Sequence, residues 1–410
     1  MQKQRFVGAV ILALMLSSLG ATAATPKSTY WVGSWACSVV GERNRRAPQG
    51  GASEEDSTIR NVVHLSLGGP AIRLRISNEF GDGPLKIGGV HVAESAGKDA
   101  TVAGSDHTVT VGGDASFTIP AGQAVVSDPI AMTVPAFADL AISFFVPKTS
   151  VFPTYHAWAF ASNFTAPGDQ ASATALSNAK KMMPWIYLRG VDVAAAPDAR
   201  AVVTLGDSIT DGMISTIDAN RRWPDDLARR LAGNPKTKNV SVLNAGISGS
   251  RILWPQAGPS MLGRFDRDVL AQPGVKYVIV YGGINDINHS QVYPDPKQSE
   301  TADDLIAGLK QLIARAHAKG LKIYGATITP GGHSRFETPA GLAMREKVNA
   351  FIRSDASGYD GLFDFDKVVR DPAHPDTLLP LYGGEASGYI HLYDAGYQAL
   401  ADSIDLSKFQ

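Results

Sequence analysis

The pattern of hydrophobic residues changes near Pro197, and this change limits the folds that the chain can adopt. From Trp31 to about Tyr187, short apolar or alternating runs are separated by Gly, Pro, Asn and Asp. Beyond Pro197, strand-like runs alternate with stretches of helical spacing. The first pattern predicts an antiparallel β-sandwich, and the second predicts a parallel sheet with helices on both faces. The sequence therefore predicts two domains of different classes.

The predicted elements place the two domains along the chain. In the first half we expect strands at residues 62–67, 72–76, 109–111, 116–119 and 140–146. In the second half we expect strands at residues 202–205, 240–243, 277–281 and 321–328, and helices at residues 224–231, 301–319, 340–353 and 394–404. We assign residues 28–190 to the β-sandwich and residues 198–410 to the α/β domain. Residues 192–197 are interpreted as the connector.

The first 23 residues have the features of a secretory signal peptide. Lys3 and Arg5 precede an apolar run at residues 6–16, and Ala21-Thr22-Ala23 has the small-x-small pattern of a cleavage site. The run is shorter than the roughly 20 residues of a membrane span. We expect cleavage after Ala23, giving an exported bacterial protein, periplasmic or secreted, without stable membrane insertion. A retained N-terminal anchor is the alternative.

The charge balance and the single cysteine exclude several functions. Lys and Arg number 38 and Asp and Glu number 39, for a formal net charge of -1. The chain thus lacks the basic excess that binding to nucleic-acid phosphates requires, so we expect no nucleic-acid partner. Cys37 is the only cysteine, which excludes intramolecular disulfides and Cys-based zinc sites. We expect it to be a small buried apolar residue.

Three glycine-rich polar clusters follow predicted strands of the second half, at residues 206–212, 244–251 and 282–286. They read Gly-Asp-Ser-Ile-Thr-Asp-Gly, Asn-Ala-Gly-Ile-Ser-Gly-Ser-Arg and Gly-Gly-Ile-Asn-Asp. A fourth polar residue, His391, stands just before the last predicted helix. In a parallel α/β sheet, reactive groups gather at the carboxyl ends of the strands. We therefore expect these segments to meet at one end of the sheet.

Each cluster taken alone has a purely structural explanation. Gly-Asp-Ser is commonly a turn, Gly246 and Gly249 could supply positive φ angles, and Asn285 with Asp286 could cap a helix. Together, however, a serine, two loops that carry donors and a histidine are the parts of an acyl-transfer site. Such a site requires neither a metal nor an organic cofactor.

The order and spelling of these clusters resemble those of the SGNH hydrolases, also called the GDSL esterase family. The resemblance implies that Ser208 is the nucleophile and His391 the base. It also implies an oxyanion hole made of the Ser208 backbone N–H, the Gly249 backbone N–H and the Asn285 side-chain amide. Gly249 stands five residues after Asn244, the spacing of the family's donor.

Two strings, at residues 206–212 and 222–225, further resemble a bacterial subgroup of this family that carries a β-rich domain ahead of the hydrolase domain. This resemblance implies a three-layer α/β/α hydrolase domain with a parallel sheet, preceded by an accessory β-sandwich. Asp207 and Asp286 are expected to bond the loop backbone and hold the shape of the site. For Arg221, Arg222 and Arg251 we favour salt bridges over positions facing the pocket.

The sequence departs from the family near the histidine. The family places Asp three residues before the catalytic His, whereas this chain has Gly388 there. A literal Asp-x-x-His occurs earlier, as Asp371 and His374. We prefer His391, because residues 394–400 resemble the helix that follows the family's histidine. His374 is interpreted as a surface turn residue.

The acceptor for the second ring nitrogen of His391 is open at this stage. Glu385 is the nearest preceding carboxylate, and we take it as a candidate third member of the catalytic set. A backbone carbonyl could serve equally well, because a neutral acceptor also orients an imidazole. Asp371 folding back, or a weak or inactive site, completes the alternatives.

The resemblance implies an esterase of short acyl chains, such as acetyl groups on a polysaccharide or a small molecule. The competing hypothesis is a weakened or inactive member of the fold that binds carbohydrate. Aromatic residues of the first half are expected mostly in the core, although residues 154–158 could wall one side of a crevice between the domains. The sequence leaves the oligomeric state open.

Overall fold

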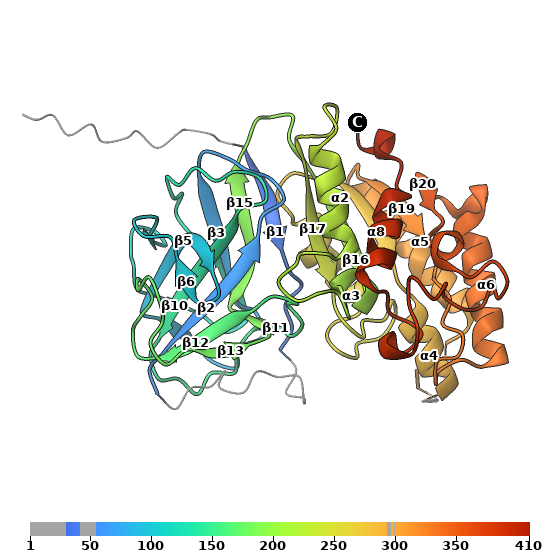
Figure 1. Ribbon diagram of the computed structural model, residues 1–410, viewed down its shortest axis with the longest axis horizontal. Coiled ribbons are helices and arrows are strands. Elements are labelled where there is room, and N and C mark those ends of the chain that lie inside the picture. The colour runs from blue at the N-terminus through green and yellow to red at the C-terminus, as the bar shows by residue number, and fades with distance from the viewer. Residues whose placement is uncertain (1–29, 42–54, 293–296, 299) are drawn as a thin grey trace, which may run out of the picture.

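The computed structural model of the chain describes residues 30–41, 55–292, 297–298 and 300–410. Antiparallel sheets make up its N-terminal part up to Ala194, called here the β region. A parallel sheet with its helices makes up residues 200–410, called the α/β region (Figure 1). The mixed α/β class and the antiparallel N-terminal sheets agree with the sequence prediction. The signal peptide predicted at residues 1–23 lies outside the described residues.

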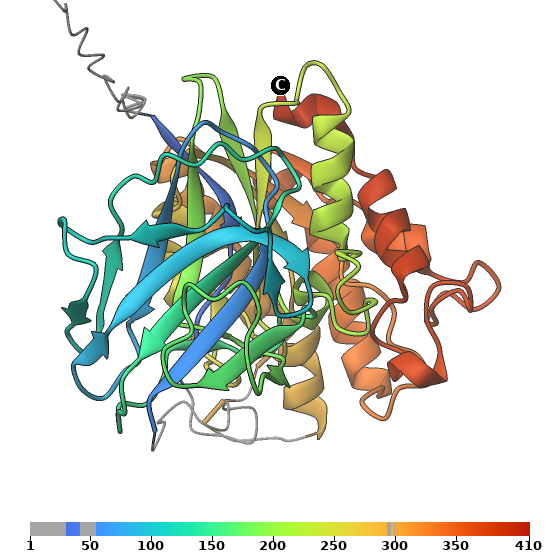
Figure 2. The same ribbon diagram turned by 60° about the vertical axis from the view of Figure 1, so that its left-hand side comes forward.

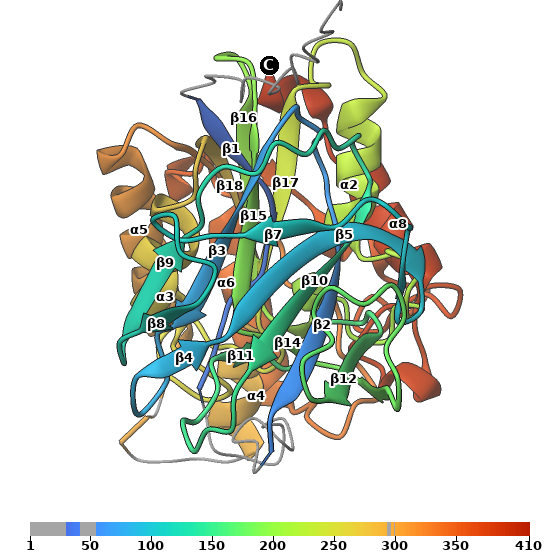
Figure 3. The same ribbon diagram turned by 90° about the vertical axis from the view of Figure 1, so that its left-hand side faces the viewer.

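Two larger antiparallel sheets form the frame of the β region (Figure 3). The first has the order β1 (Trp31–Ala36), β15 (Leu188–Ala194), β3 (Ile72–Asn78) and β9 (Gln123–Val126). The second has the order β13 (Lys180–Met182), β12 (Asn163–Pro167), β2 (Ser57–His64), β10 (Asp139–Val146), β5 (Gly89–Gly97) and β6 (Ala100–Thr101), and β7 (His107–Val109) also pairs with β5. Two small sheets pair β4 (Leu85–Ile87) with β8 (Phe117–Ile119) and β11 (Tyr155–His156) with β14 (Trp185–Ile186).

One hydrophobic core lies between the two larger sheets. Alternate residues of β3, including Leu74 and Ile76, are completely buried, and so are Leu140 and Ile142 of β10. Both sets belong to the same cluster of contacting side chains. The alternation follows from the strand period of two, which sends every second side chain to the same face.

The five strands of the α/β region are all parallel, in the order β17 (Val240–Gly246), β16 (Arg200–Gly206), β18 (Val275–Tyr281), β19 (Lys322–Ala326) and β20 (Gly361–Phe363). One face packs against α3 (Met261–Phe265), α5 (Ala302–Ala318) and α6 (Pro339–Arg353). The other packs against α2 (Trp223–Ala232), α7 (Phe365–Val369) and α8 (Asp394–Asp402). Figure 2 shows helices on both sides of this sheet. Two further helices, α1 (Ser208–Asp211) and α4 (Ile284–Val292), follow β16 and β18.

The structure adds elements that the sequence patterns did not indicate. Helices α4 and α7, strand β20 and the π-helical turn at Asp266–Leu270 were not predicted. Strand β15 continues to Ala194, four residues past the predicted domain end and into the predicted connector. The strand persists because Val191 and Val193 fill the core of the β region, while Asp192 between them pairs with Arg73 and Arg75.

The two regions share a packed interface along β1 and β17. The Ser241 hydroxyl donates to the Gly33 carbonyl at 2.6 Å, and the backbone N–H of Val242 donates to the Ser66 hydroxyl at 3.1 Å. Val32 of β1 is completely buried within the hydrophobic core of the α/β region. A Cβ atom on Gly33 would lie 2.8 Å from the Leu243 side chain, so a larger residue there would displace that side chain.

No helix in the described part of the chain has both the length and the apolar character needed to cross a membrane.

Candidate active site

Ser208 stands where the first strand of the parallel sheet turns into a helix. Strand β16 ends at Gly206, Asp207 caps the following helix, and Ser208 is the first residue of α1. The Asp207 carboxylate accepts a hydrogen bond from the Ile209 N–H at 3.0 Å. Burial raises the pKa of Asp207 to about 7. Its cap on α1 fixes the turn that presents the serine at the carboxyl end of the sheet.

His391 lies against Ser208. The distance from its Nε2 to the Ser208 hydroxyl oxygen is 2.9 Å, and its Nδ1 is 3.2 Å from the carbonyl oxygen of Ser387. A carbonyl only accepts hydrogen bonds, so Nδ1 carries the proton and Nε2 is free to accept from the serine. Burial lowers the pKa of His391, while the bond to Ser387 raises it in part. The histidine is therefore neutral near pH 7 and able to take a proton.

The acceptor at Nδ1 is a main-chain carbonyl, and Glu385 does not occupy this place. Glu385 is exposed at the start of the short helical turn Glu385–Ser387. Gly388, at the family's Asp position, adopts a left-handed conformation with φ +63°. Its N–H bonds back to the Glu385 carbonyl at 2.9 Å, closing the turn that aims the Ser387 carbonyl at the histidine. The sequence left several acceptors open for Nδ1 of His391, and in the structure the acceptor is the backbone carbonyl of Ser387.

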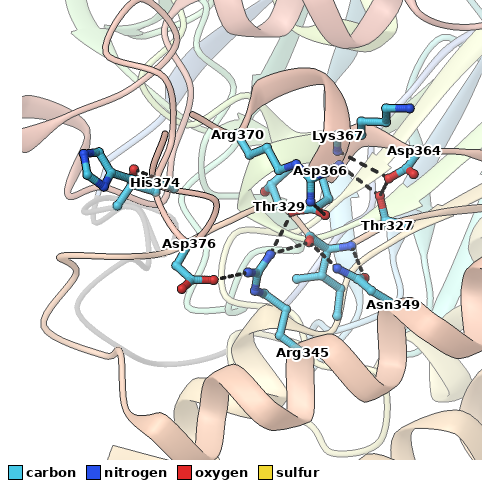
Figure 4. Close-up of polar contacts among 12 residues, drawn as sticks. Thr327, Thr329, Arg345, Asn349, Asp364, Asp366, Lys367, Arg370, His374 and Asp376 are labelled. Atoms are coloured by element: carbon cyan, nitrogen blue, oxygen red, sulfur yellow. Dashed lines mark hydrogen bonds and ion pairs between the residues drawn. The ribbon is translucent and has the colours of Figure 1, made fainter. Parts of the chain in front are cut away.

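The second Asp-x-x-His string lies in an exposed turn. Asp371 accepts from the Ala373 N–H at 2.8 Å, and the Thr377 hydroxyl donates to the His374 carbonyl at 2.9 Å. Figure 4 shows the His374 ring turned away from a neighbouring network. In that network Arg345 joins Asp366 at 2.9 Å to Asp376 at 3.2 Å and so ties this turn to the sheet.

Gly249 occupies a tight turn at residues 247–250. The Ser250 N–H bonds to the Ile247 carbonyl at 2.8 Å, and Gly249 has φ +86°, the conformation that the third residue of a type II turn requires. The backbone N–H groups of Gly249 and Ser208 donate to no other residue in the described ranges. Gly246 is different, because it lies in β17 and a Cβ there would meet the Asp211 nitrogen at 2.4 Å. Close packing, and not a positive φ, requires glycine at that position.

Asn285 stands in the first turn of α4, and its side-chain amide donates to the Ser250 carbonyl at 3.1 Å. One N–H of the amide is used in this bond, which leaves the second for a ligand. The next residue, Asp286, is completely buried and accepts from the N–H groups of Ile252 and Leu253 at 2.9 and 3.2 Å. Burial raises the pKa of Asp286 to about 7. As expected, Asp207 and Asp286 bond loop backbone and shape the site.

Arg264 was not predicted from the sequence, but it links the loops at residues 206–212 and 244–251. Its guanidinium is completely buried and donates to the carbonyls of Gly206 and Ala245 at 2.8 and 2.6 Å. It also reaches the Ser250 hydroxyl at 3.3 Å and the Ser38 hydroxyl of the β region at 2.9 Å. Its local sequence gave no signal, because Arg264 is followed closely by the charged residues Asp266, Arg267 and Asp268.

The three other arginines near the site form ion pairs, as favoured from the sequence. Arg251 pairs with Glu300 and donates to the Gln298 side chain at 2.8 Å. The remaining pairs are Arg222 with Asp225 at 2.6 Å and Arg221 with Asp226 at 3.8 Å.

The described ranges hold no cluster of three His, Cys, Asp or Glu side chains suited to a metal ion. Cys37 is buried, and its thiol donates to the Leu188 carbonyl at 3.4 Å. Burial raises the pKa of this thiol, so Cys37 stays protonated and packs as an apolar residue.

Residues 204–399 match the model of the GDSL-like lipase/acylhydrolase family, a stretch that contains Ser208, Gly249, Asn285 and His391. The α/β region therefore carries a domain of the GDSL-like lipase/acylhydrolase family. A comparison with curated proteins gave no match.

Several solved structures resemble about half of the chain. A putative lipolytic protein of the G-D-S-L family from Desulfitobacterium hafniense is 20% identical over 51% of this chain and 99% of its own, with a TM-score of 0.38. A GDSL-like lipase from Bacteroides thetaiotaomicron is 18% identical over 51% and 87%, with a TM-score of 0.37. An acetylxylan esterase from Geobacillus stearothermophilus is 19% identical over 51% and 94%, with a TM-score of 0.38.

Proposed function

We propose that the protein is an exported serine esterase that hydrolyses short-chain acyl esters, acetyl esters foremost, through an acyl-enzyme on Ser208. The observation that carries the proposal is the 2.9 Å contact between the Ser208 hydroxyl and Nε2 of His391, with Nδ1 of the same ring on a carbonyl. A serine hydroxyl becomes a useful nucleophile only when a neighbouring base takes its proton.

Acylation follows from these positions. Nε2 of His391 takes the hydroxyl proton as the Ser208 oxygen attacks the ester carbonyl carbon, and the carbonyl oxygen becomes negatively charged. The N–H groups of Ser208 and Gly249 and the amide of Asn285 are the donors for this charge, because each has a hydrogen atom without an acceptor among the described residues. Collapse of the tetrahedral intermediate breaks the bond to the alcohol, which leaves with the proton from Nε2.

Deacylation repeats these steps with water as the nucleophile. Nε2 takes a proton from the water molecule, the water oxygen attacks the acyl carbon, and Ser208 leaves and regains its proton from the histidine. Throughout, the Ser387 carbonyl keeps Nδ1 protonated. We therefore propose a Ser208–His391 dyad oriented by a neutral acceptor, in which Glu385 takes no part.

Short acyl groups suit the mixed pocket beside α4. It is lined by the apolar side chains of Ile284, Ile287 and Phe336 and also by polar ones, including Asn288, Glu337, Arg345 and Asp376. The half-buried end of α4, residues 288–291, reads Asn-His-Ser-Gln, which is too polar for the apolar lid of a long-chain lipase. The alcohol half of the ester is either a small molecule or a polysaccharide in this proposal.

Export and domain organisation complete the proposal. Residues 1–23 serve as the signal peptide, residues 28–190 as an accessory β-sandwich, and residues 198–410 as a three-layer α/β/α hydrolase domain. The core shared by the two larger antiparallel sheets and the helices on both faces of the parallel sheet support this division.

The test is labelling by a fluorophosphonate together with hydrolysis of p-nitrophenyl acetate. The wild type should react with the probe and release p-nitrophenol, whereas Ser208→Ala should do neither, because only an activated hydroxyl attacks the phosphorus. A wild type that neither labels nor hydrolyses this undemanding ester would contradict the proposal and favour a carbohydrate-binding protein.

A further inference from the structure

His156 of the β region contacts the end of α1, the short helix that begins with Ser208. Nε2 of His156, in β11, lies 2.9 Å from Oδ1 of Asp211, the last residue of α1 and three residues after Ser208. Each of the two side chains is only 4% exposed. The contact therefore joins the two regions in a place that water hardly reaches.

The other oxygen of Asp211 holds the oxyanion turn. Its Oδ2 accepts from the backbone N–H of Ser248 at 2.8 Å and from the Ser248 hydroxyl at 2.6 Å. Ser248 directly precedes Gly249, so the peptide unit between them carries the N–H proposed to stabilise the oxyanion. Two bonds to one carboxylate oxygen fix Ser248 and, with it, the direction of that N–H.

The ring of His156 faces only acceptors. Its Nδ1 is 2.8 Å from the Ser38 carbonyl, and its Nε2 also lies 3.3 Å from the Trp158 carbonyl. Since a carbonyl cannot donate, both nitrogens carry hydrogen and the ring is an imidazolium. Burial opposes this charge, but the Asp211 carboxylate and the Ser38 and Trp158 carbonyls together raise the pKa of His156. The Trp185 ring, 5.4 Å away between centroids, packs against the imidazolium and fixes its place.

We propose that His156 is a positioning residue for the esterase reaction, which acts through Asp211 on the Gly249 N–H. The inference rests on the proposed function. Without the imidazolium, Asp211 is a buried carboxylate that lacks its counter-charge, and its side chain turns toward another partner or draws in water. Either change loosens Ser248 and misaligns an N–H whose task is to meet the charge of the transition state. The β region is thereby part of the catalytic apparatus, although none of its atoms touches the substrate.

The first test is the His156→Gln variant with p-nitrophenyl acetate. Removal of one oxyanion-hole donor costs about 10²–10³ in kcat, so a misaligned donor should cost about tenfold to a hundredfold with KM nearly unchanged. The matched control is His91→Gln. His91 forms a similar pair with Asp106 at 2.8 Å, within the β region, and its loss should leave kcat unchanged. Equal kcat values for His156→Gln and the wild type would overturn the inference.

A double-mutant cycle separates positioning from a general role in the interface. Ser248→Ala removes one donor to Asp211 from the other side and leaves the interface intact. If both residues act through Asp211, the double variant should lose less kcat than the product of the two single losses. Losses that multiply would show that His156 acts elsewhere and would overturn the proposal. If His156→Gln fails to fold, as judged by circular dichroism, Ser248→Ala alone decides: a fall in kcat at constant KM supports the inference, and an unchanged kcat overturns it.

The two proposals fail in different ways. A wild type without esterase activity contradicts the proposed function. An active wild type whose kcat survives the loss of His156 contradicts only the inference drawn here.

Discussion

The two sides of the candidate site are built by different means. On the serine side, buried ionisable side chains hold the loops: Asp207, Asp286 and Arg264 each bind main-chain groups of the site loops. On the histidine side, hydrogen bonds to the main chain hold His391 in place. The Ser387 carbonyl accepts from both the backbone N–H and the ring of His391, each at 3.2 Å.

This difference follows the charge that the proposed reaction creates. Negative charge develops on the substrate oxygen at the serine side, where donors must be aligned before the reaction begins. The histidine instead needs one acceptor that keeps its tautomer, and a carbonyl suffices for that. The buried ionisable side chains that hold the loops therefore lie on the serine side, whereas the group that orients His391 is a carbonyl.

The largest expected effect concerns the choice of base. His391→Ala should lower kcat by about 10⁴-fold or more, because loss of a catalytic histidine removes the activation of the serine. Hydrolysis of p-nitrophenyl acetate measures it, with His374→Ala as the matched control that should retain full activity. A loss confined to the His374 variant would mean that the histidine side of the site lies elsewhere.

The next effect tests the serine side. Asn285→Ala should reduce kcat by about 10²–10³-fold at nearly constant KM, the usual result of deleting one oxyanion-hole donor. Asn239→Ala is a suitable control, since that side chain bonds to Asp198 at 2.8 Å and stands just before β17, at the end of the strand opposite to the site. If kcat stays unchanged in the Asn285 variant, the oxyanion hole has been assigned wrongly.

The pH dependence tests the neutral acceptor. The base must be unprotonated, so kcat/KM rises as pH increases through the pKa of His391. Because burial lowers this pKa from its usual 6.5, the acid limb of the profile should have its midpoint below pH 6.5. A carboxylate at Nδ1 would shift the midpoint upward instead. A midpoint above pH 6.5 would therefore contradict a neutral acceptor on the histidine side.

The smallest effect is expected at Glu385. Loss of the orienting Asp costs about 10⁴ in kcat in triads built around one. Here Glu385→Gln should keep kcat within about twofold of the wild type, since the Ser387 carbonyl orients the ring. The exposed Glu346 offers a control substitution to Gln. A loss of activity specific to Glu385 would restore it as the third member of the catalytic set.

Much of this arrangement could be predicted because local patterns encode it. Alternating residues marked β3 and β10, and helical spacing marked α5 and α8. Ser208, Gly249 and Asn285 became candidates because the order and spacing of the glycine-rich strings resemble those of the SGNH hydrolases. Helix α7 and strand β20 escaped because five residues or fewer give little periodicity, and α4 escaped because most of its nine residues are polar.

The interactions that tie the site together had no such signal. Arg264 and His156 act on residues far along the chain, so only the packed structure brings them together. The Ser387 carbonyl is a main-chain group that every residue possesses, and its role depends on the left-handed turn at Gly388. Sequence reasoning could offer a carbonyl as one alternative but had no means to select it.

The packing of β1 against β17 has a consequence for any attempt to separate the two regions. Strand β17 is the outermost strand of the parallel sheet, and Ser66 of the β region occupies the outward N–H of Val242. An outermost strand with open N–H and C=O groups is a template for intermolecular pairing, which proteins suppress by covering it. Without the β region, the α/β region would expose the edge of β17 to pairing with other chains and would lose Val32 from its core. The N-terminal sheets thus cover this sheet edge against aggregation, and an isolated α/β region would need another cover for it.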